Sequence, residues 1–338
     1  MSEQTLSQIA KAMVANGKGI LAADESSGNI KKKFEKLGVE DMSENHRRYR
    51  ELLFTAPGME KYISGVILFD ETIRQATSDG LPFAQYLSSK GVVPGIKVDI
   101  GLKDMDGHVG EQVTKWDDTL DARLKEYYAL GARFAKWRVV INIGAGIPSD
   151  ECIETNCKTL TEYARLCQAN GIVPIVEPEV LMDGDHTIDR CYEVTHKTLS
   201  TLFSELKKAN VDLSGLILKP NMVVYSSNGE KVSADIVAQK TLQCFKETVP
   251  AEVPGIVFLS GGQSEPESCV NLNAINKLAK EQNSPWKLTF SYGRALQNSA
   301  LKNWSGKEEN KIKSQEIFAH RAQLASAASL GEYKIEME

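Results

Sequence analysis

Eight short apolar runs alternate with longer amphipathic segments along the 338-residue chain. Short apolar runs of this kind are typical of strands buried in a sheet or barrel core. Strands that alternate with helices pair in parallel through crossovers, and eight such units favour closure into a barrel. The sequence therefore predicts an α/β fold, a (β/α)8 TIM barrel, with strands at 19–23, 63–69, 93–98, 134–141, 172–176, 213–218, 255–259 and 288–290.

Segments with helical spacing separate these runs. An extra helix at 6–14 precedes the barrel, and two helices follow it, at 295–304 and 309–330. No linker rich in Pro, Gly or Ser divides the chain, so we expect one domain, 1–338, with 295–338 as C-terminal helices and tail. Between the strands, the pattern predicts helices at 41–54, 81–88, 116–130, 150–169, 186–209, 234–248 and 266–280.

Composition narrows the classes of function. A net charge of −5, with 42% hydrophobic and 25% charged residues, is ordinary for a globular protein and indicates no nucleic-acid or acidic-membrane partner. No apolar run reaches the roughly 20 residues of a membrane span, and the first residues do not resemble a signal peptide, so we expect a cytoplasmic protein. The six cysteines lack CxxC spacing and the five histidines lack ligand spacing, which predicts reduced thiols and no metal.

Charged and polar residues stand at the ends of the predicted strands, where barrels of this class carry their chemistry. Eight strands would seldom all end this way by chance. In chain order the residues are Asp24, Asp70, Lys97 with Asp99, Lys136 with Arg138, Glu177 with Glu179, Lys219 with Asn221, Ser260 with Gly261 and Gly262, and Ser291 with Gly293 and Arg294.

Lys219 directly follows an apolar run and precedes Pro220. Lysine is seldom buried without a partner, so one interpretation is that Lys219 caps a strand and points to water. The other is an amine nucleophile whose pKa is lowered by burial and by neighbouring cations such as Lys136, so that it can form a Schiff base with a carbonyl substrate. The other strand ends favour the second interpretation.

Two pairs of charged residues share a face of their strands, because side chains two positions apart point the same way. Lys136 and Arg138 form one pair, and Glu177 and Glu179 form the other. They could make inward salt bridges that only fill the barrel. Around a reactive lysine they could instead divide the proton-transfer roles, with Glu177 and Asp24 as acid or base and the lysines as electrophilic stabilisers.

The last two strands end in the loops LSGGQS and SYGRAL. Backbone N–H groups at glycines can approach an anion, and Arg294 adds a bidentate donor at the start of a helix. Barrels often bind phosphate with these two loops, although either alone could be a tight turn. Lys97 and Arg138, with residues 23–33, could hold a second phosphate, while Lys31 to Lys33 alone would be typical of a solvated helix face.

In chain order the sequence contains the motifs GKGILAADES, IKVD, FAKWR, IVEPE, LKPNMV, FLSGGQSE and SYGRALQ. With them it closely resembles the class I fructose-bisphosphate aldolases, the Schiff-base enzymes of glycolysis, over nearly its whole length. The resemblance implies reversible aldol cleavage of fructose 1,6-bisphosphate to dihydroxyacetone phosphate and glyceraldehyde 3-phosphate. It also implies sugar phosphates as partners, no cofactor and a homotetramer.

The resemblance further implies roles for single residues. Lys219 would form the imine, and Glu177 would act as acid and base on the carbinolamine. Asp24, beside Lys136, would take the proton of the C4 hydroxyl, and Glu179 belongs to the same catalytic set. The phosphate sites would comprise Ser260, Gly261, Gly262, Ser291, Gly293 and Arg294 at C1, and Ser26, Asn29, Lys33, Lys97 and Arg138 around C6 or the sugar chain.

The sequence departs from the animal members of that family at three places. They have a serine and an arginine at Asn29 and Lys33, and lysine does not replace arginine neutrally at a bidentate phosphate site. They have a lysine at Ile100. Their tail ends in a tyrosine that assists proton exchange, for which Tyr333 in EYKIEME stands too early. The preference for bisphosphate over monophosphate therefore stays open, as do a Schiff-base aldolase for another sugar phosphate and an added binding role.

Overall fold

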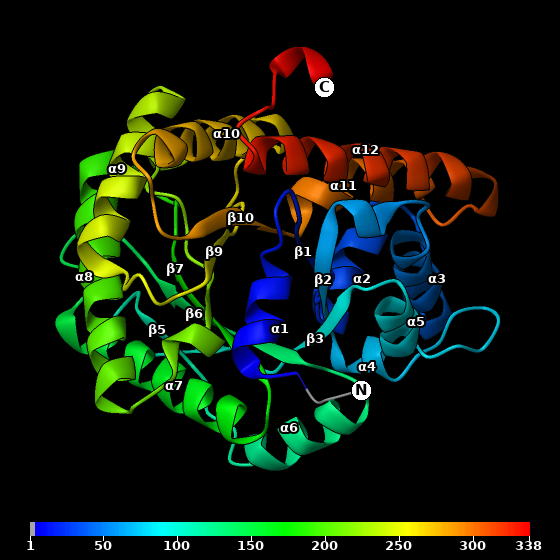
Figure 1. Cartoon of the computed structure of the whole chain (residues 1–338), viewed down its shortest axis with the longest axis horizontal. Coiled ribbons are helices and arrows are strands. Elements are labelled where there is room, and N and C mark those ends of the chain that lie inside the picture. The colour runs from blue at the N-terminus through cyan, green and yellow to red at the C-terminus, as the bar shows by residue number, and fades with distance from the viewer. Residues whose placement is uncertain (1–3) are drawn as a thin grey trace.

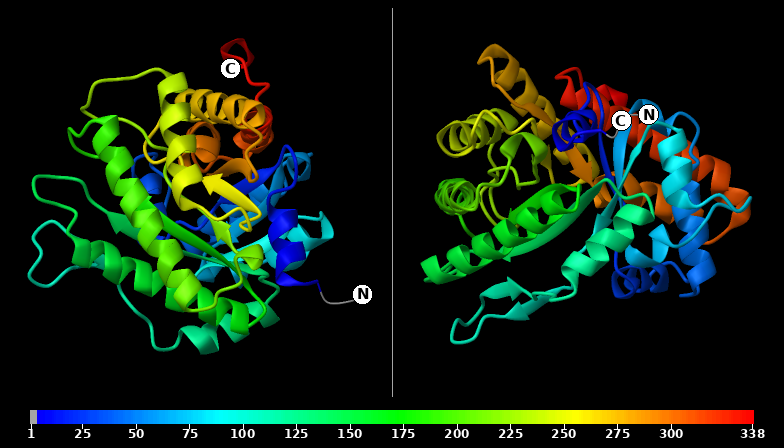
Figure 2. Two further views of the ribbon diagram at one scale, coloured as in Figure 1. Left: turned by 60° about the vertical axis from the view of Figure 1, so that its left-hand side comes forward. Right: turned by 60° about the horizontal axis from the view of Figure 1, so that its bottom comes forward.

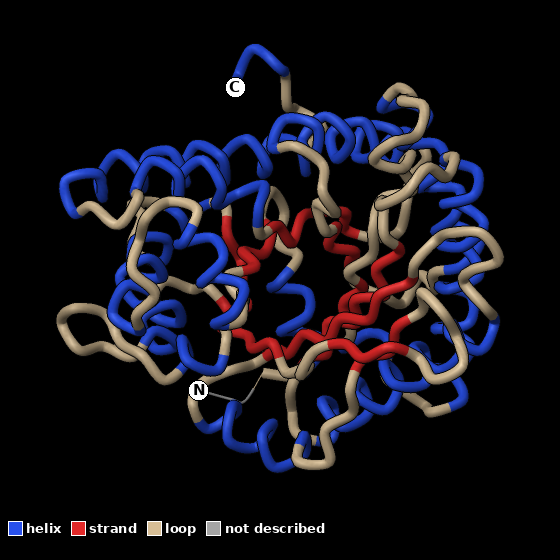
Figure 3. The backbone as a smooth tube through the Cα atoms, turned by 180° about the vertical axis from the view of Figure 1, so that it is seen from behind, coloured by secondary structure: helices blue, strands red, loops and turns tan. Residues whose placement is uncertain are grey.

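Eight parallel strands form a closed barrel in the computed structural model, which describes residues 4–338. The strands form a ring inside a layer of helices (Figure 3). Their order around the barrel is β1-β10-β9-β8-β7-β6-β3-β2, so the predicted (β/α)8 architecture is confirmed. The bounds are β1 Gly19–Ala22, β2 Ile63–Leu68, β3 Val93–Lys97, β6 Phe134–Ile141, β7 Val173–Val180, β8 Ile217–Leu218, β9 Gly255–Phe258 and β10 Lys287–Tyr292.

Twelve α-helices occur within residues 4–338, and most of them cover the outer face of the barrel (Figure 1). Four of the long helices begin where a Ser or Thr side chain accepts a hydrogen bond from a backbone N–H in the first turn: Ser149, Thr187, Ser233 and Ser264. The bounds are α1 Leu6–Met13, α2 Ser27–Glu35, α3 Ser43–Phe54, α4 Asp70–Ile73, α5 Phe83–Ser89, α6 Leu120–Ala129, α7 Asp150–Ala169, α8 Ile188–Lys208, α9 Ala234–Thr248, α10 Glu265–Glu281, α11 Arg294–Trp304 and α12 Lys311–Ser329.

Helix α1 closes the N-terminal end of the barrel. It is the predicted extra helix, and its apolar face buries Ile9, Ala10 and Met13. These side chains, with Val14, form a separate core with residues inside the barrel, among them Ile20, Ile67, Phe134, Val173, Ile175, Ile217 and Val257. A larger core lies between the strands and the outer helices. The interior is therefore apolar at the end covered by α1, which leaves the C-terminal ends of the strands for polar residues.

The ring of Phe134 fills the barrel beside β3. It lies so close to Gly95 that a Cβ atom there would come within 2.2 Å of the ring. It also passes within 3.2 Å of the place where a Cβ of Gly65 would lie. Glycine is thus required at position 95 by the approach of an aromatic ring, and this packing joins β2, β3 and β6.

The segment between β3 and α6 differs from the prediction. Helix α6 begins at Leu120 rather than 116, because the Asp117 carboxylate accepts a hydrogen bond from the Thr119 N–H (2.9 Å) and holds a turn. Before it, β4 Leu102–Asp104 and β5 Gln112–Thr114 form an unpredicted antiparallel hairpin. The hairpin extends from the barrel (Figure 2), and Thr114 Oγ1 anchors it by donating to the Arg138 carbonyl (2.8 Å).

Three predicted strands have clearly different lengths in the structure. The eighth covers Lys287–Tyr292 rather than 288–290, so Ser291 lies inside it. The sixth keeps only Ile217–Leu218, because the Asp212 carboxylate accepts from the Ser214 N–H (2.9 Å) and turns 213–215 into a 3-10 helix. The fifth runs to Val180, because β7 pairs with β6 along its whole length. Glu177 and Glu179 therefore lie inside the strand rather than beyond its end.

Residues 23–33, expected only as a basic loop, contain most of α2. Ile30 and Phe34 are the buried residues of this helix. Lys31 and Lys32 are exposed, so the solvated-face interpretation is correct for these two, whereas Lys33 is partly buried. All six cysteines are free, and all are buried rather than at the surface. No helix within residues 4–338 is both long and apolar enough to cross a bilayer.

Candidate active site

A cavity of about 1070 Å³ opens at the C-terminal ends of the strands. Sixteen residues were predicted for the site, and the structure brings fifteen of them to its wall. Only Gly262 does not line it. Its φ of +104° requires glycine, and a Cβ there would lie 3.1 Å from the Met182 sulfur. The cavity walls contain Lys219, Glu177, Asp24, Lys136, Glu179, Ser26, Asn29, Lys33, Lys97, Arg138, Ser260, Gly261, Ser291, Gly293 and Arg294.

Lys219 is buried at the end of β8. Its backbone N–H donates to the Val176 carbonyl (2.9 Å), which extends the pairing with β7 by one residue. Its side chain is 5% exposed, and Nζ lies 3.1 Å from Oε1 of Glu177. The interpretation that Lys219 caps a strand and points to water is therefore wrong.

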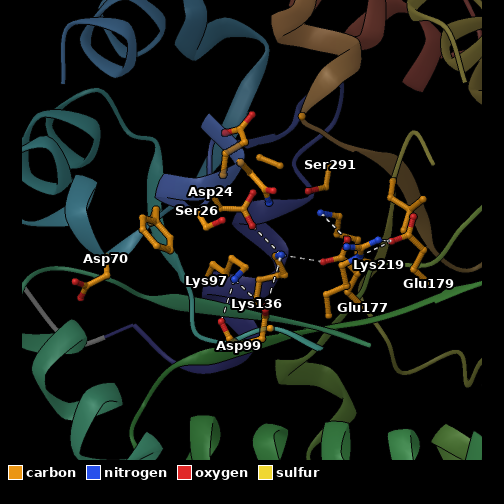
Figure 4. Close-up of a pocket in the computed structure, with 18 of the residues that line it drawn as sticks. Asp24, Ser26, Asp70, Lys97, Asp99, Lys136, Glu177, Glu179, Lys219 and Ser291 are labelled. Carbon is orange, nitrogen blue, oxygen red and sulfur yellow. Dashed lines mark hydrogen bonds and ion pairs between the residues drawn. The ribbon is translucent and has the colours of Figure 1, made fainter. Parts of the chain in front are cut away.

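Lys136 lies among three carboxylates (Figure 4). Its Nζ is 2.7 Å from Asp24, 3.2 Å from Glu177 and 3.8 Å from Asp99. Burial would lower the pKa of Lys136, but these negative charges outweigh it and raise the pKa well above its usual range. The three carboxylates compensate the positive charge of Lys136. Lys136 therefore repels a positive charge on Lys219 less strongly than expected from the sequence.

The two carboxylates beside the lysines are held ionised. Burial would raise the pKa of Asp24, but the charges of Lys136, Lys219 and Lys97 lower it far below the ordinary value. The same balance lowers the pKa of Glu177, with Lys136, Lys219 and Arg138 as the opposing charges. At neutral pH both groups are proton acceptors poised beside a buried amine.

The inward ion pairs considered from the sequence do form. Arg138 donates to the Glu179 carboxylate, and Lys136 Nζ lies 3.2 Å from Oε2 of Glu177. All four residues nevertheless line the cavity. The pairing therefore does not exclude the functional interpretation, because these ion pairs form part of the wall that a ligand would meet.

The last two loops line the cavity together. Gly261, after β9, has a φ of +58°, a conformation that glycine adopts without strain. The buried hydroxyl of Ser291 has no hydrogen-bond partner among the described residues. Arg294 begins α11 and also lines the cavity, and it forms no ion pair with any of residues 4–338. An unpaired guanidinium beside a free hydroxyl at a helix N-terminus suits a phosphate group.

A second group of polar residues lines the cavity from α2 and β3. Ser26 and Asn29 come from the N-terminal end of α2, and Lys33 from its next turn. Lys97 completes the group, and its Nζ also lies over the Phe69 ring at 6.0 Å. The cavity therefore has cationic groups from two separate sets of elements, at the start of α11 and on α2 with β3.

The cavity also includes residues that the sequence did not single out for a role. Asp70 and Asp99 were noted at strand ends, but only their position could be predicted. Glu25, next to Asp24, gave no distinguishing signal. The others are Ala22 at the end of β1, Leu102 at the start of β4, and residues of helices and loops whose approach to the barrel mouth depends on tertiary packing: Phe69, Arg74, Ile100, Gly101, Arg123, Tyr127 and Leu259.

Among residues 4–338, no group of three or more His, Cys, Asp or Glu side chains is arranged to hold a metal ion. The carboxylates of the cavity are instead engaged with lysines and arginines.

The sequence and the structure were compared with known proteins. The family described as "Fructose-bisphosphate aldolase class-I" matches residues 5–338. A probable fructose-bisphosphate aldolase class 1 of Xanthomonas campestris pv. campestris is 55% identical over 99% of this chain and 100% of its own length. The cytosolic fructose-bisphosphate aldolase 5 of Arabidopsis thaliana is 52% identical over 97% of this chain and 91% of its own length.

Among solved structures, the fructose-bisphosphate aldolase of Plasmodium falciparum, crystallised with TRAP and a small-molecule inhibitor, superimposes with a TM-score of 0.95. It is 48% identical, and the match covers 97% of this chain and 95% of that one. Together with the barrel and the lysine–carboxylate site at its open end, these matches show that the chain belongs to the class I fructose-bisphosphate aldolase family.

Proposed function

We propose that this protein catalyses the reversible aldol cleavage of fructose 1,6-bisphosphate to dihydroxyacetone phosphate and glyceraldehyde 3-phosphate, in glycolysis. The family supports the reaction, and the full-length match to enzymes of that name supports the substrate. The observation that carries the proposal is the buried amine of Lys219, 3.1 Å from the Glu177 carboxylate at the open end of the barrel. Two separate groups of cations in one cavity, Arg294 on α11 and Lys33 with Lys97 on α2 and β3, suit a sugar with two phosphates.

The first half of the proposed reaction joins the sugar to the protein. In its neutral form the Nζ of Lys219 attacks the C2 ketone, whose oxygen takes up one proton from solvent, and forms a carbinolamine. Glu177, ionised beside Lys219, takes a proton from the attacking amine and returns it to the hydroxyl that leaves as water. The protonated imine then withdraws electrons from C3. The protein itself supplies this electron sink, so the proposed route uses no metal or cofactor.

The second half breaks the bond between C3 and C4. Asp24 takes the proton of the C4 hydroxyl, and the electrons of the bond move into the imine to give an enamine and a free aldehyde. Lys136 stabilises the ionised form of Asp24, which lies 2.7 Å away. Glu179 keeps Arg138 in the wall. Protonation at C3 and hydrolysis of the imine release dihydroxyacetone phosphate and restore Lys219.

The phosphates fit the two polar walls. We assign the C1 phosphate to the loops after β9 and β10, with Arg294 as the unpaired cation. The other phosphate, with the C4 to C6 part of the sugar, contacts the cavity residues of α2, β3 and β6, which we call the α2 wall. The assigned residues are Ser260, Gly261, Gly262, Ser291 and Gly293 on the first side, and Ser26, Asn29, Lys33, Lys97 and Arg138 on the second.

Trapping of the imine tests the proposal. Borohydride added with dihydroxyacetone phosphate is expected to attach one ketone-derived mass to the peptide that contains Lys219, read by mass spectrometry. Lys219→Ala should lose both the adduct and the cleavage activity. Lys158→Ala, which removes an exposed amine on α7, should keep both. An adduct that persists in Lys219→Ala, or wild-type protein that neither cleaves the sugar nor forms an adduct, would contradict the assignment.

We also propose a cytoplasmic location and a homotetramer. Plant relatives are named as cytosolic isozymes, which supports the location. The tetramer is supported by the resemblance to the family.

A further inference from the structure

Arg50 places a positive charge in the core behind the cavity wall, and its own side chain does not line the cavity. It lies on α3, its side chain is 1% exposed, and it does not line the cavity. Its guanidinium stacks over the ring of Tyr49, 5.6 Å from the centroid. Tyr49 donates to Gln297 on α11, and Gln297 donates to the Ala22 carbonyl at the end of β1. Arg50 is therefore held against the loop that carries Asp24 and Ser26.

Glu25 lies between this buried cation and a cation of the cavity. Its Oε2 is 2.8 Å from Nη2 of Arg50, and its Oε1 is 2.5 Å from Nζ of Lys33. Glu25 is 13% exposed at its side chain, and Lys33 is 24% exposed. The three residues thus form a chain of charges, positive, negative and positive, that runs from the core to the α2 wall.

This arrangement leaves one positive charge facing the cavity. Burial would raise the pKa of Glu25, but Arg50 and Lys33 lower it, so the carboxylate is ionised. Arg50 alone balances that charge. Lys33 can therefore move to an anion without leaving a buried carboxylate unpaired, a state that costs several kcal/mol in proteins.

The other cations of the α2 wall have no such support. Lys97 pairs with Asp99 and Arg138 with Glu179. Asp99 also lies 3.8 Å from Lys136, but Lys136 lines the cavity and shares its charge with Asp24 and Glu177. Among the described residues, Lys33 is thus the cation of this wall whose partner carboxylate pairs with a buried cation that does not line the cavity.

We propose that Arg50 is a positioning residue for the second phosphate: by neutralising Glu25 from the core side, it frees the charge of Lys33 for that phosphate and gives the enzyme its preference for a bisphosphate. This inference deepens the proposed function and rests on it. The inference also explains why a lysine suits position 33. A flexible amine can move between a carboxylate and a ligand more readily than the rigid guanidinium of an arginine.

The first test compares substrates in Arg50→Met, which keeps the length of the side chain and removes its charge. Without Arg50, Glu25 holds Lys33 more tightly. KM for fructose 1,6-bisphosphate should rise about tenfold, the order expected for one charge-assisted contact, while kcat changes little. KM for fructose 1-phosphate, which lacks the second phosphate, should change far less. Arg50→Lys should restore much of the bisphosphate preference, and Arg48→Met, on the same helix but paired with Glu308 at the surface, should not alter it.

A double variant separates charge balance from packing. In Glu25→Gln/Arg50→Met the carboxylate that would hold Lys33 is also gone, so KM for the bisphosphate should return toward the wild-type value. If Arg50 serves only to stabilise the fold, the double variant will bind the bisphosphate no better than Arg50→Met, and the inference is overturned. An equal rise in KM for both sugars in Arg50→Met would overturn it as well. Arg50→Gln replaces Arg50→Met if the latter does not fold.

Binding of hexitol 1,6-bisphosphate, an analogue that cannot be cleaved, makes the result independent of turnover. Calorimetry should give the same tenfold weakening in Arg50→Met and the same recovery in the double variant. Absence of cleavage by the wild-type protein would count against the proposed function alone. Unchanged affinity of Arg50→Met for the analogue, in a wild-type enzyme that cleaves the sugar, would count against Arg50 alone.

Discussion

Lys136 takes its place from strands that are distant in sequence. It stands on β6, while its carboxylate partners follow β1, follow β3 and lie on β7. Removing one member of a buried cluster of charges leaves the remaining charges without partners. A buried carboxylate or amine without a partner tends to lose its charge. The charge states of Asp24 and Glu177 are therefore a property of the cluster, and Lys136 is its common member.

Replacement of Lys136 by Met should change how stability depends on pH. The pKa values of Asp24 and Glu177 lie below their ordinary 3.8 and 4.5 in the folded protein. Their ionised forms therefore stabilise the fold above about pH 4.5, and this contribution is lost as the pH falls through the lowered values. Without Lys136 both pKa values rise, so stability near neutral pH should drop by about 3 kcal/mol or more and its decline below pH 4.5 should become shallower.

Urea unfolding of the two proteins between pH 3 and 7 measures this difference. Lys158→Met, which breaks an exposed pair with Glu154, is the matched control and should follow the wild-type curve. Parallel curves for the wild type and Lys136→Met would contradict the coupling of Lys136 to the carboxylates.

Strand ends and chain order were enough to find most of the cavity wall from the sequence. Parallel strands bring their carboxyl ends to one edge, so Asp24, Lys136, Glu177 and Lys219 had to converge once eight strands were recognised. The role of Arg50 was not accessible in this way. It depends on how α3 packs beneath the first loop, and a lone arginine in a helix gives no periodic or motif signal.

Helices and strands with strong patterns were predicted well, and elements fixed by single side chains were not. Helices α7 and α9 have a clear apolar face and a Ser cap, and α9 matches its predicted range residue for residue. The start of α6 and the length of β8 were missed, because Asp117 and Asp212 each divert a short segment into a turn. The β4–β5 hairpin was missed because it lies outside the eight-unit repeat.

The packing of β3 against β6 can be tested at Gly95. A methyl group at this position would overlap the Phe134 ring, and both residues lie in a closed barrel that cannot easily expand. Gly95→Ala should therefore destabilise the protein by about 1–3 kcal/mol, the usual range for overpacking a core. Chemical denaturation measures the change.

Gly28→Ala is the control for that substitution. Gly28 lies in α2, and a Cβ there meets no atom within 4 Å. Alanine should be neutral or slightly stabilising at this position, because it favours the helix. Equal stabilities for Gly95→Ala and Gly28→Ala would show that the barrel interior yields to the added methyl group.

At the scale of the whole molecule, the tetramer proposal gives a direct expectation. Light scattering should yield a mass four times the 37.3 kDa of the chain. An assembly would also cover exposed apolar side chains such as Val109 at the hairpin and Ile312 on α12, which are 97% and 72% exposed. A dilution series should keep the same mass, and a mass of one chain at all concentrations would contradict the proposal.

Helix α1 fills one end of the barrel with Ile9, Ala10 and Met13, and the cavity opens at the other end, where the strands finish. The sugar enters, and the uncleaved sugar or its two cleavage products leave, through this same open end. In the proposed reaction the half bonded to Lys219 leaves only after its bond is hydrolysed, so the free aldehyde leaves first. In the synthetic direction the proposed order reverses, and an aldehyde that enters before the ketone would stand in the path to Lys219.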